Sequence, residues 1–477
     1  MASGFRKEKD LLGEMEIPAD VLWGIHSARA KENFEFPSRR HVHPGLIRAY
    51  GQVKLACARA NHSLGYLEDE RFKFIEIACR EMADGHLNEW IIVEPLQGGA
   101  GTSTNLNVSE VIANRALVLA GRSPGDYGYI DPIEHVNLHQ STNDTYPTAL
   151  KVAVFRELKN LETYINRLQE ECQAKEREFA GVLKAGRTEM MDAVPITLGR
   201  EFGAWAEAFA RDRWRVYKCT ERIRVVNLGG TAVGTGLDAP RDYIFKVVDY
   251  LREITGLPIA RAENLLEATQ NADVFVEVSG ILKAHAMNLL KISGDLRLMA
   301  SGPDAGLGEI TLPELQTGSS IMPGKVNPVI PEFMAQVAIQ VSSMDQAIGW
   351  ASGMGQLELN AYMPLIAENM LGMLDLLIAA NKAASERCIN GIIANVERCR
   401  DLAHKTEAIA TVLLPLIGYK KASDVAKAMN TEGLDLFEAS QKVAGLSREQ
   451  VEKLVTPDAV NALGFVVEKN KKEEMGL

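Results

Sequence analysis

The sequence predicts a mainly α-helical protein built around a bundle of long helices. The clearest helical segment carries apolar residues, with one histidine among them, at steps of three and four: Val274, Val278, Ile281, His285, Leu289, Ile292, Leu296 and Met299. Such steps place the side chains on one buried face of a helix, so we expect His285 to be a hydrogen-bonded core residue. Similar patterns fill residues 148–173, 196–226 and 331–384, and all three are poor in internal proline. Repeated helices of this length are typical of a bundle.

The size and composition of the chain indicate a folded protein with more than one core. At 477 residues, it predicts two or three domains, or one elongated element that is shared between subunits. Hydrophobic residues make up 46% and charged residues 24% of the chain, which excludes a disordered protein. The net charge of −11 argues against general binding of nucleic acid. A few bases in a pocket could still attract an anionic metabolite.

The cysteines and the N-terminus favour the cytoplasm. The six cysteines are scattered, without a Cys-x-x-Cys pair or a histidine at zinc spacing: Cys57, Cys79, Cys172, Cys219, Cys388 and Cys399. We expect them to be reduced thiols that pack in the core. Residues 1–10 are polar rather than signal-like, and we expect no apolar run of the ~20 residues that span a membrane.

Four irregular segments carry the polar residues of a candidate site. Residues 301–328 are broken repeatedly by Gly and Pro, and a loop this long in a compact protein is usually functional or disordered. It retains Ile, Leu and Met, so we expect an ordered functional loop. Residues 97–107 (QGGAGTSTNLN), 139–148 (HQSTNDTYPT) and 185–189 (AGRTE) are also irregular, the last one preceding a helical segment.

Each of these segments alone could be simple turn or capping chemistry. Together they supply short neutral donors, backbone N–H groups beside glycines and one fixed cation, Lys325. That set suits a small carboxylate substrate. The spacing along the chain does not by itself show that the segments converge.

Residues 318–328, GSSIMPGKVNP, resemble the signature of the aspartase/fumarase superfamily. Four further segments agree with it in order and approximate spacing: residues 97–107, 135–148 (HVNLHQSTNDTYPT), 186–199 (GRT followed by DAVPITLG) and 227–237 (NLGGTAVGTGL). The resemblance runs from about Asp10 to the C-terminus.

Within the superfamily the details are more similar to aspartases than to fumarases. They lie in residues 11–34, in DAVP at Asp192 and in NPVIPE at 327–332, where fumarases tend to have a polar residue soon after the NP. The resemblance implies a C–N lyase that eliminates ammonia or an amine from an amino acid such as aspartate, giving an unsaturated acid such as fumarate.

The resemblance also implies a fold and an assembly. The expected subunit has an N-terminal helical domain at 1–142, a central long-helix bundle at 143–395 with its signature loop at 301–328, and a small C-terminal helical domain at 396–477. Subunits of the superfamily form a homotetramer with a twenty-helix core, and three subunits build each active site. The expected partners are a small amino acid or dicarboxylate substrate and other copies of the chain, with no nucleic acid and no membrane.

The resemblance assigns roles to individual residues. Ser319 is the expected general base, and it must be strongly activated because a free hydroxyl is a poor base. The expected substrate contacts, sorted by role, are Lys325 and Asn327 for the carboxylate remote from the leaving group, Thr102, Ser141, Thr142 and Ser320 for the carboxylate that becomes the aci form, and Asn143 and Thr188 near the leaving amine. No metal or other cofactor is expected to be required. Activation by magnesium is a trait of aspartases, but its site cannot be placed in this sequence.

One residue departs from the family pattern. Glu189 follows the GRT threonine, where the family usually has His or Gln; in fumarases that His pairs with a glutamate that matches Glu332. Two carboxylates at close range would raise one pKa. Alternatively, Glu189 is protonated or turned onto Arg187 and replaces Gln in shape. A third hypothesis is a bulky or quaternary ammonium substrate, as in ergothionase-like members, with Met190 and Met191 lining a wider pocket.

Two other functions compete with the C–N lyase. Fumarate hydratase shares the signature, but NPVIPE and the missing His at position 189 disfavour it. A non-catalytic structural homologue, as among the crystallins of this superfamily, is opposed by the presence of Ser319, Lys325 and Asn327.

Overall fold

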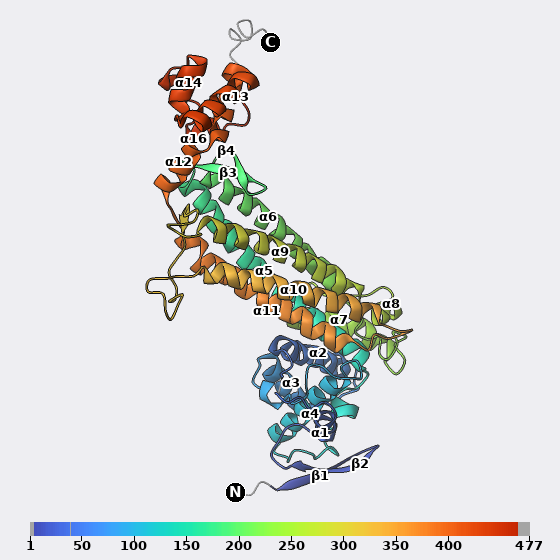
Figure 1. Cartoon of the computed structure of the whole chain (residues 1–477). Helices are drawn as coiled ribbons and strands as arrows, with labels where there is room; N and C mark the ends of the chain where they lie inside the picture. Colours follow the sequence, from blue (N-terminus) through green and yellow to red (C-terminus); the bar gives the residue numbers. More distant parts are fainter. Residues whose placement is uncertain (1–3, 39, 466–477) are drawn as a thin grey trace. The chain divides into compact units, whose positions relative to one another are not determined.

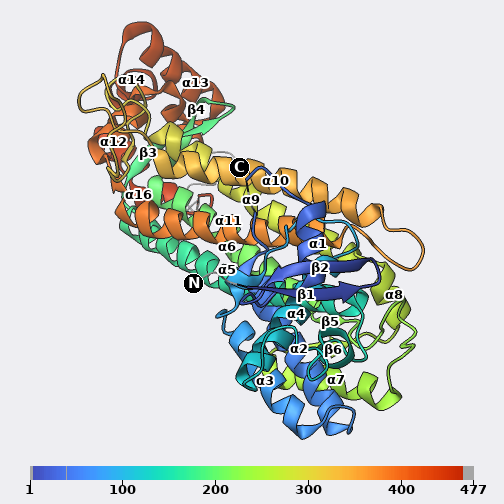
Figure 2. The same ribbon diagram turned by 90° about the horizontal axis from the view of Figure 1, so that it is seen from below.

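The computed structural model describes residues 4–38 and 40–465, and most of them are helical (Figure 1). The prediction of a mainly α-helical protein is confirmed. Five long helices run alongside one another in both views (Figures 1 and 2): α5 (Thr142–Glu178), α6 (Leu198–Ile223), α9 (Asp273–Met299), α10 (Val329–Gly353) and α11 (Met363–Arg387). Side chains tie neighbouring helices together; the Ser279 hydroxyl of α9, for example, donates to Asp345 of α10 over 2.7 Å.

The remaining helices are shorter. Before α5 they are α1 (Ile25–Asn33), α2 (Pro44–Ser63), α3 (Asp69–Ala83), α4 (Thr102–Leu119) and the single turns η1 (Asn88–Trp90) and η2 (Pro132–Val136). After α6 they are α7 (Arg241–Thr255) and α8 (Leu265–Gln270). The C-terminal set is η3 (Ile389–Gly391), α12 (Val396–Lys405), η4 (Glu407–Leu413), α13 (Leu414–Glu432), α14 (Leu436–Ala444), α15 (Arg448–Glu452) and α16 (Pro457–Asn461).

The strands in the described residues form four two-stranded sheets. Three are antiparallel: β1 (Phe5–Asp10) with β2 (Gly13–Pro18), β3 (Leu183–Thr188) with β4 (Met191–Thr197), and β7 (Ile310–Thr311) with β8 (Ile393–Ala394). The short strands β5 (Val225–Val226) and β6 (Ala260–Arg261) pair in parallel. None of these sheets is large enough to form a core, so helix packing builds the protein.

The chain divides into two compact units, each made of separate stretches of sequence. Unit 1 comprises Met1–Thr163, Trp214–Met287 and Val337–Ile378, and unit 2 comprises Tyr164–Arg213, Asn288–Gln336 and Ala379–Leu477. Each of the five long helices therefore contributes one part to each unit. The expected domain limits at residues 142 and 395 remain a prediction, and the last part of the third domain, 466–477, lies outside the described residues.

The helical periodicity located most of the long helices. The stripe from Val274 to Met299 coincides with α9, and His285 is buried as expected. The prediction of one continuous segment at 331–384 is wrong, because residues 354–362 separate α10 from α11. The Asn360 side chain donates to the carbonyls of Ala351 and Ser352 at 3.0 and 3.1 Å, and thereby caps the last turn of α10.

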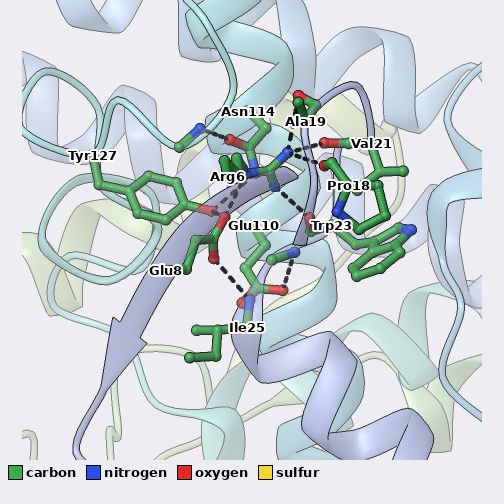
Figure 3. Close-up of polar contacts among 12 residues, drawn as sticks. Arg6, Glu8, Pro18, Ala19, Val21, Trp23, Ile25, Glu110, Asn114 and Tyr127 are labelled. Carbon is green, nitrogen blue, oxygen red and sulfur yellow. Dashed lines mark hydrogen bonds and ion pairs between the residues drawn. The ribbon is translucent and has the colours of Figure 1, made fainter. Parts of the chain in front are cut away.

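In unit 1, the β1–β2 hairpin is fastened by a buried polar cluster (Figure 3). The Arg6 side chain donates to Glu8 over 2.8 Å. Glu8 also accepts from the Tyr127 hydroxyl at 3.0 Å and from the Ile25 backbone N–H at 2.8 Å. Glu110 lies in the same cluster and accepts from backbone N–H groups at the start of α1. These carboxylates stabilise the positive end of that helix.

In unit 2, the C-terminal helices enclose a small apolar core formed by Ile409, Leu413, Val425, Met429, Leu436, Ala439 and Val451 together with Ala410 and Ala428. Helix α14 begins with a capping box between Asp435 and Glu438. The β3–β4 hairpin lies beside α12 and η4 (Figure 1). These helices thus hold the strands of the hairpin.

All six cysteines are buried and free, which confirms that they are packing residues. One helix, Met363–Gly391, is long and apolar enough by length and composition alone to cross a membrane, although Glu368, Asp375 and Lys382 interrupt its apolar residues, and 56% of its most apolar window is buried inside the protein. Partial burial of this kind is also found in core helices of a bundle.

Candidate active site

Four predicted substrate contacts lie together in unit 1. Thr102 is the first residue of α4, and Thr142 is the first residue of α5, preceded by Ser141 and followed by Asn143. Helix N-termini present free backbone N–H groups and a partial positive charge, which attract anions. The hydroxyl groups of this set therefore lie where a carboxylate can be bound.

The polar segments 97–107 and 139–148 are packed directly against each other. The Asn105 side chain donates to the Thr142 hydroxyl at 3.2 Å, and its own oxygen accepts from the Thr145 hydroxyl at 3.3 Å. Gly101 has a φ of +97°, and a Cβ there would lie 2.1 Å from the ring of Tyr146. Only glycine allows this close approach between the loop 97–101 and helix α5.

A buried carboxylate joins the third loop, 227–237, to this pair. Asp144 accepts from the backbone N–H groups of Ser141 at 3.0 Å and of Gly229 and Thr231 at 3.1 Å each. Burial raises the pKa of Asp144 to about 6, although the three N–H groups favour its charged form. The carboxyl group therefore fixes the turn that carries Ser141 and Thr142.

Asn143 is held at both its side chain and its backbone. Its side-chain amide donates to the Ala232 carbonyl at 2.7 Å, and its backbone carbonyl accepts from Asn227 at 3.0 Å. The structure gives its side-chain oxygen no hydrogen bond within residues 4–38 and 40–465. That oxygen is a free acceptor, as the expected role beside an amine requires.

A buried lysine, Lys54, is hydrogen-bonded to the segment 135–148, which carries Ser141 and Thr142. The Lys54 ammonium donates to Asn137 at 2.8 Å and to Gln140 at 3.1 Å. Burial lowers the pKa of Lys54 to about 8. Asn137 also accepts from Asn105 at 3.1 Å, so the lysine connects to the same network as Thr142.

In unit 2, the signature loop arranges donors around Ser319. The Ser319 Oγ accepts from the backbone N–H groups of Met322 at 3.0 Å and of Ile321 at 3.2 Å. Two N–H donors on one oxygen favour its negative form. The neck of the loop is narrow, because a Cβ on Gly318 would lie 2.8 Å from the Lys325 carbonyl.

The other predicted residues of this loop are mostly exposed. Asn327 donates to the Gly318 carbonyl at 3.0 Å, which uses one of its two amide hydrogens and leaves one for a ligand. Ser320 and Lys325 are exposed, and Glu332 lies half-buried in the first turn of α10. Within the part of the chain that the structure describes, Lys325 has no ion pair.

Thr188 and Glu189 form the tip of the β3–β4 hairpin, also in unit 2. Glu189 and Met190 are the two turn residues, with φ of +54° and +68°, and both are exposed. Positive φ at both turn positions matches the twist of a tight hairpin. Residues with a Cβ, such as these two, adopt it only with conformational strain. The segment that was expected to be a loop is therefore one strand of a hairpin and its turn.

The structure tests two hypotheses about Glu189. Arg187 does not hold it: the Arg187 guanidinium pairs with Glu309 at 2.8 Å. Among the described residues, Glu189 makes no hydrogen bond or ion pair, either with Glu332 or with the signature loop. The closeness of the two carboxylates within one active site stays a prediction.

Three residues of the unit 1 network were missed from the sequence. Asn105, Asp144 and Asn227 all stand inside the recognised motifs, yet only the structure reveals that they are buried and join the loops. For Asn105 and Asp144 the available signal was a polar residue in the first turn of a helix, which is also typical of ordinary capping. Within the described residues, no group of three or more His, Cys, Asp or Glu side chains could hold a metal ion.

The chain was compared with known protein families and solved structures. Residues 13–343 match the family model described as lyase, and residues 409–460 match the fumarase C C-terminus. An aspartate ammonia-lyase from Bacillus sp. is 46% identical over 96% of this chain and 97% of its own length. Another from Escherichia coli K12 is 43% identical over 92% of both chains.

Solved structures agree with these relatives. A fumarate lyase:delta crystallin from Brucella melitensis, bound to cobalt, has a TM-score of 0.91 and 46% identity, with 95% of this chain and 98% of that chain covered. A class II fumarase from Schistosoma mansoni has a TM-score of 0.89 and 30% identity, with the same coverage. The chain therefore belongs to this lyase family, the aspartase/fumarase superfamily.

Proposed function

We propose that the protein is an ammonia-lyase that converts aspartate, or a closely similar amino acid, into fumarate and ammonia. The observation that carries this proposal is the Ser319 Oγ, which accepts two backbone N–H groups in a loop that matches the superfamily signature. Relatives named aspartate ammonia-lyase, at 42–46% identity over nearly the whole chain, support the choice of substrate.

The first step is removal of a proton from the carbon next to a carboxylate. The Ser319 alkoxide takes this proton and becomes a hydroxyl, while the electron pair of the C–H bond moves into the carboxylate. That carboxylate becomes an aci form with two negative charges. Donors aimed at such developing charge each contribute about 3–4 kcal/mol.

In the second step the electron pair returns and forms the C=C bond as the C–N bond breaks. The amine leaves with the electrons of that bond as ammonia, and ammonia then accepts the proton from the Ser319 hydroxyl. Thr102, Ser141, Thr142 and Ser320 are the proposed donors to the aci-carboxylate. Lys325 and Asn327 bind the other carboxylate, and Asn143 and Thr188 lie beside the amine.

The reaction is tested with purified protein by following the absorbance of fumarate. Aspartate should form fumarate, and fumarate should be consumed with ammonia present but not with water alone. Turnover should lie in the ordinary enzymatic range of ~1–10³ s⁻¹. Hydration of fumarate to malate at a comparable rate, without use of ammonia, would instead establish a fumarate hydratase.

We also propose that the active form is a homotetramer in which three subunits build each site. This proposal is supported by the family and by the separation of the predicted residues into unit 1 segments and unit 2 segments. Two inactive variants, Thr142→Ala and Ser319→Ala, should regain part of the activity when mixed and reassembled. A fully active monomer in sedimentation would contradict the shared site.

A second candidate substrate is an amino acid with a larger cationic leaving group. The supporting observation is Glu189, a carboxylate at the hairpin tip without a cationic partner in the described residues. A negative charge near a dicarboxylate is costly unless a positive charge lies between them. This substrate predicts weak activity on aspartate and a gain when Glu189→Gln is introduced, measured over N-substituted aspartates and betaine-type amino acids. Ordinary aspartate turnover that Glu189→Gln does not raise would leave Glu189 as a neutral substitute for Gln.

A further inference from the structure

Four charged side chains form a buried cluster in unit 2, beneath the β3–β4 hairpin. Glu309, which directly precedes β7, accepts from Arg187 of β3 at 2.8 Å. Its second oxygen lies 3.3 Å from the Lys184 ammonium, also on β3. Lys184 in turn donates to Glu201 of α6 at 2.7 Å. We call these residues the Glu309 cluster.

The cluster is more buried than a surface ion pair. The side-chain exposure is 0% for Glu309 and 2% for Lys184, against 15% for Arg187 and 25% for Glu201. Two bases balance two acids, so the buried charge is compensated as a set. Burial nevertheless raises the pKa of Glu201, and among the described residues neither Glu201 Oε2 nor Glu309 Oε2 has a hydrogen-bond partner.

Such a cluster contributes little to stability compared with an apolar core of the same volume. Its physical effect is to fix one geometry, because removal of one member leaves another buried charge without a partner. The Glu309 cluster therefore fixes the positions of the segments that carry its members.

Glu309 lies in the first part of the signature loop, ahead of the tip that carries Ser319. Its backbone N–H donates to Met299 of α9 at 2.8 Å, and its carbonyl accepts from Asn395 N–H at 2.9 Å and from the Cys399 thiol at 3.3 Å. The Glu309 N–H is thus bound to the end of α9, and its carbonyl is bound to α12 and to the residue that precedes α12. Glu309 is a rigid anchor.

The ion pair with Arg187 links Glu309 to the tip of the β3–β4 hairpin. The strand pairing shifts register between Ala185 and Arg187, and a Cβ on Gly186 would lie 2.5 Å from the Val194 carbonyl. A bulge of this kind redirects the neighbouring side chain. The side chain of Arg187 is directed at Glu309, and the next two residues are Thr188 and Glu189 of the tip.

We propose that Glu309 is a positioning residue for the amine end of the substrate, acting through Arg187 on Thr188 and Glu189. The proposal rests on the proposed function, because that function places Thr188 beside the leaving amine. Glu309 does not touch the substrate. It holds the bulged strand so that the tip meets the amine at the correct distance.

The reverse reaction separates this role from a general structural one. When fumarate and ammonia are the substrates, each has its own KM, so the amine site and the carboxylate site are read independently. Glu309→Gln removes the charge and keeps the shape. We expect the KM for ammonia to rise about tenfold or more, since a displacement of about 1 Å can cost ~100-fold, while the KM for fumarate stays within about twofold.

Glu8→Gln is the matched control. Glu8 is also a buried glutamate that accepts from an arginine, at 2.8 Å, but its partners lie in the β1–β2 hairpin and at the start of α1. We expect this variant to leave both KM values unchanged. Equal changes in the two KM values of Glu309→Gln, or the same selective change in Glu8→Gln, would overturn the proposal.

A second variant and a second measurement keep the test independent of folding and of activity. If Glu309→Gln loses helical circular dichroism, Arg187→Lys should give the same selective rise in the KM for ammonia, because it retains the charge but loses the planar guanidinium whose Nη1 donates to both Glu309 and the Ala185 carbonyl. Hydrogen exchange of residues 187–191 should accelerate in the Glu309 variant and not in Glu8→Gln. Unchanged exchange at the tip would contradict the positioning role. If the wild type has no ammonia-lyase activity but Glu309→Gln still accelerates exchange at residues 187–191, the proposed function is refuted while the positioning of the tip by Glu309 stands.

Discussion

The two units carry their parts of the candidate site in opposite ways. In unit 1, the loops around Thr102 and Thr142 are interlocked by Asn105, Asp144 and Asn227, all of them at most 1% exposed. In unit 2, the loop around Ser319 has an exposed apolar tip, with Ile321 84% and Met322 48% exposed. The unit 1 donors to the aci-carboxylate are thus fixed before substrate arrives, whereas the loop tip that carries the proposed base and the cation Lys325 is held by few contacts.

The difference follows from how each segment satisfies its backbone. The unit 1 loops end in helices α4 and α5, whose first N–H groups are held in place by packing. In the loop at 301–328, Glu309 and β7 are fixed to neighbouring helices and strands, whereas the tip at 318–327 is held by the bridge between Thr317 and Val326 and by hydrogen bonds within the loop itself. Segments with few buried contacts open at low free-energy cost, and moving active-site parts are drawn from them. We infer that substrate orders the unit 2 loop and not the unit 1 loops.

The largest expected effect comes from Ser319→Ala. Loss of a general base should lower kcat by about 100- to 10,000-fold, while circular dichroism keeps its helical signal because the loop lies outside the helices. Assays should use aspartate at saturation. A variant that keeps more than about a tenth of the normal kcat would end the assignment of Ser319 as the base.

The next largest effect comes from Lys325→Ala in the same loop. A fixed cation opposite a carboxylate acts in the ground state and the transition state alike, so KM should rise while kcat changes little. We expect kcat/KM to fall by about 10- to 100-fold, the loss of one charge-assisted hydrogen bond. Lys325→Arg is the control, and it should recover part of the loss. An unchanged KM in Lys325→Ala would exclude this role.

A smaller effect concerns Asp144 and is measured on stability. Its pKa of about 6 in the folded protein lies above the ordinary value of 3.8, so the folded state binds the proton more tightly. The stabilisation from Asp144 is therefore full below pH 3.8 and is lost as the pH rises through about 6. The total is about 3 kcal/mol by the shift of roughly two pKa units. In urea unfolding, Asp144→Asn should remove this loss between pH 4 and 6; an identical pH dependence in both proteins would contradict it.

The helices were largely predictable, because their apolar stripes repeat over many turns, as in α9. The break between α10 and α11 was not, since it depends on Asn360 capping a helix end nine residues earlier in the chain. The motif residues were also found from the sequence. The burial of Asp144 and Asn105 was not, because the same residue types at a helix start serve equally as solvent-exposed caps.

The contacts of the Glu309 cluster were even less predictable from the sequence. Glu309 lies 122 residues from Arg187 along the chain, and single charged residues at that separation carry no pairing signal in one sequence. The hairpin turn at Glu189 and Met190 was missed for another reason. Neither residue is typical of a turn with positive φ, so the sequence lacked the glycine or asparagine that usually marks one.

The most direct test of this contrast is hydrogen exchange of the backbone amides with and without saturating fumarate. In the free protein, we expect the amides of residues 318–327 to exchange rapidly and those of residues 144–150, inside α5, to exchange slowly. Fumarate should slow exchange strongly at 318–327 and change little at 144–150. Slow exchange of residues 318–327 without ligand, or protection by fumarate at 144–150 alone, would contradict the division into fixed unit 1 donors and a unit 2 loop tip that substrate orders.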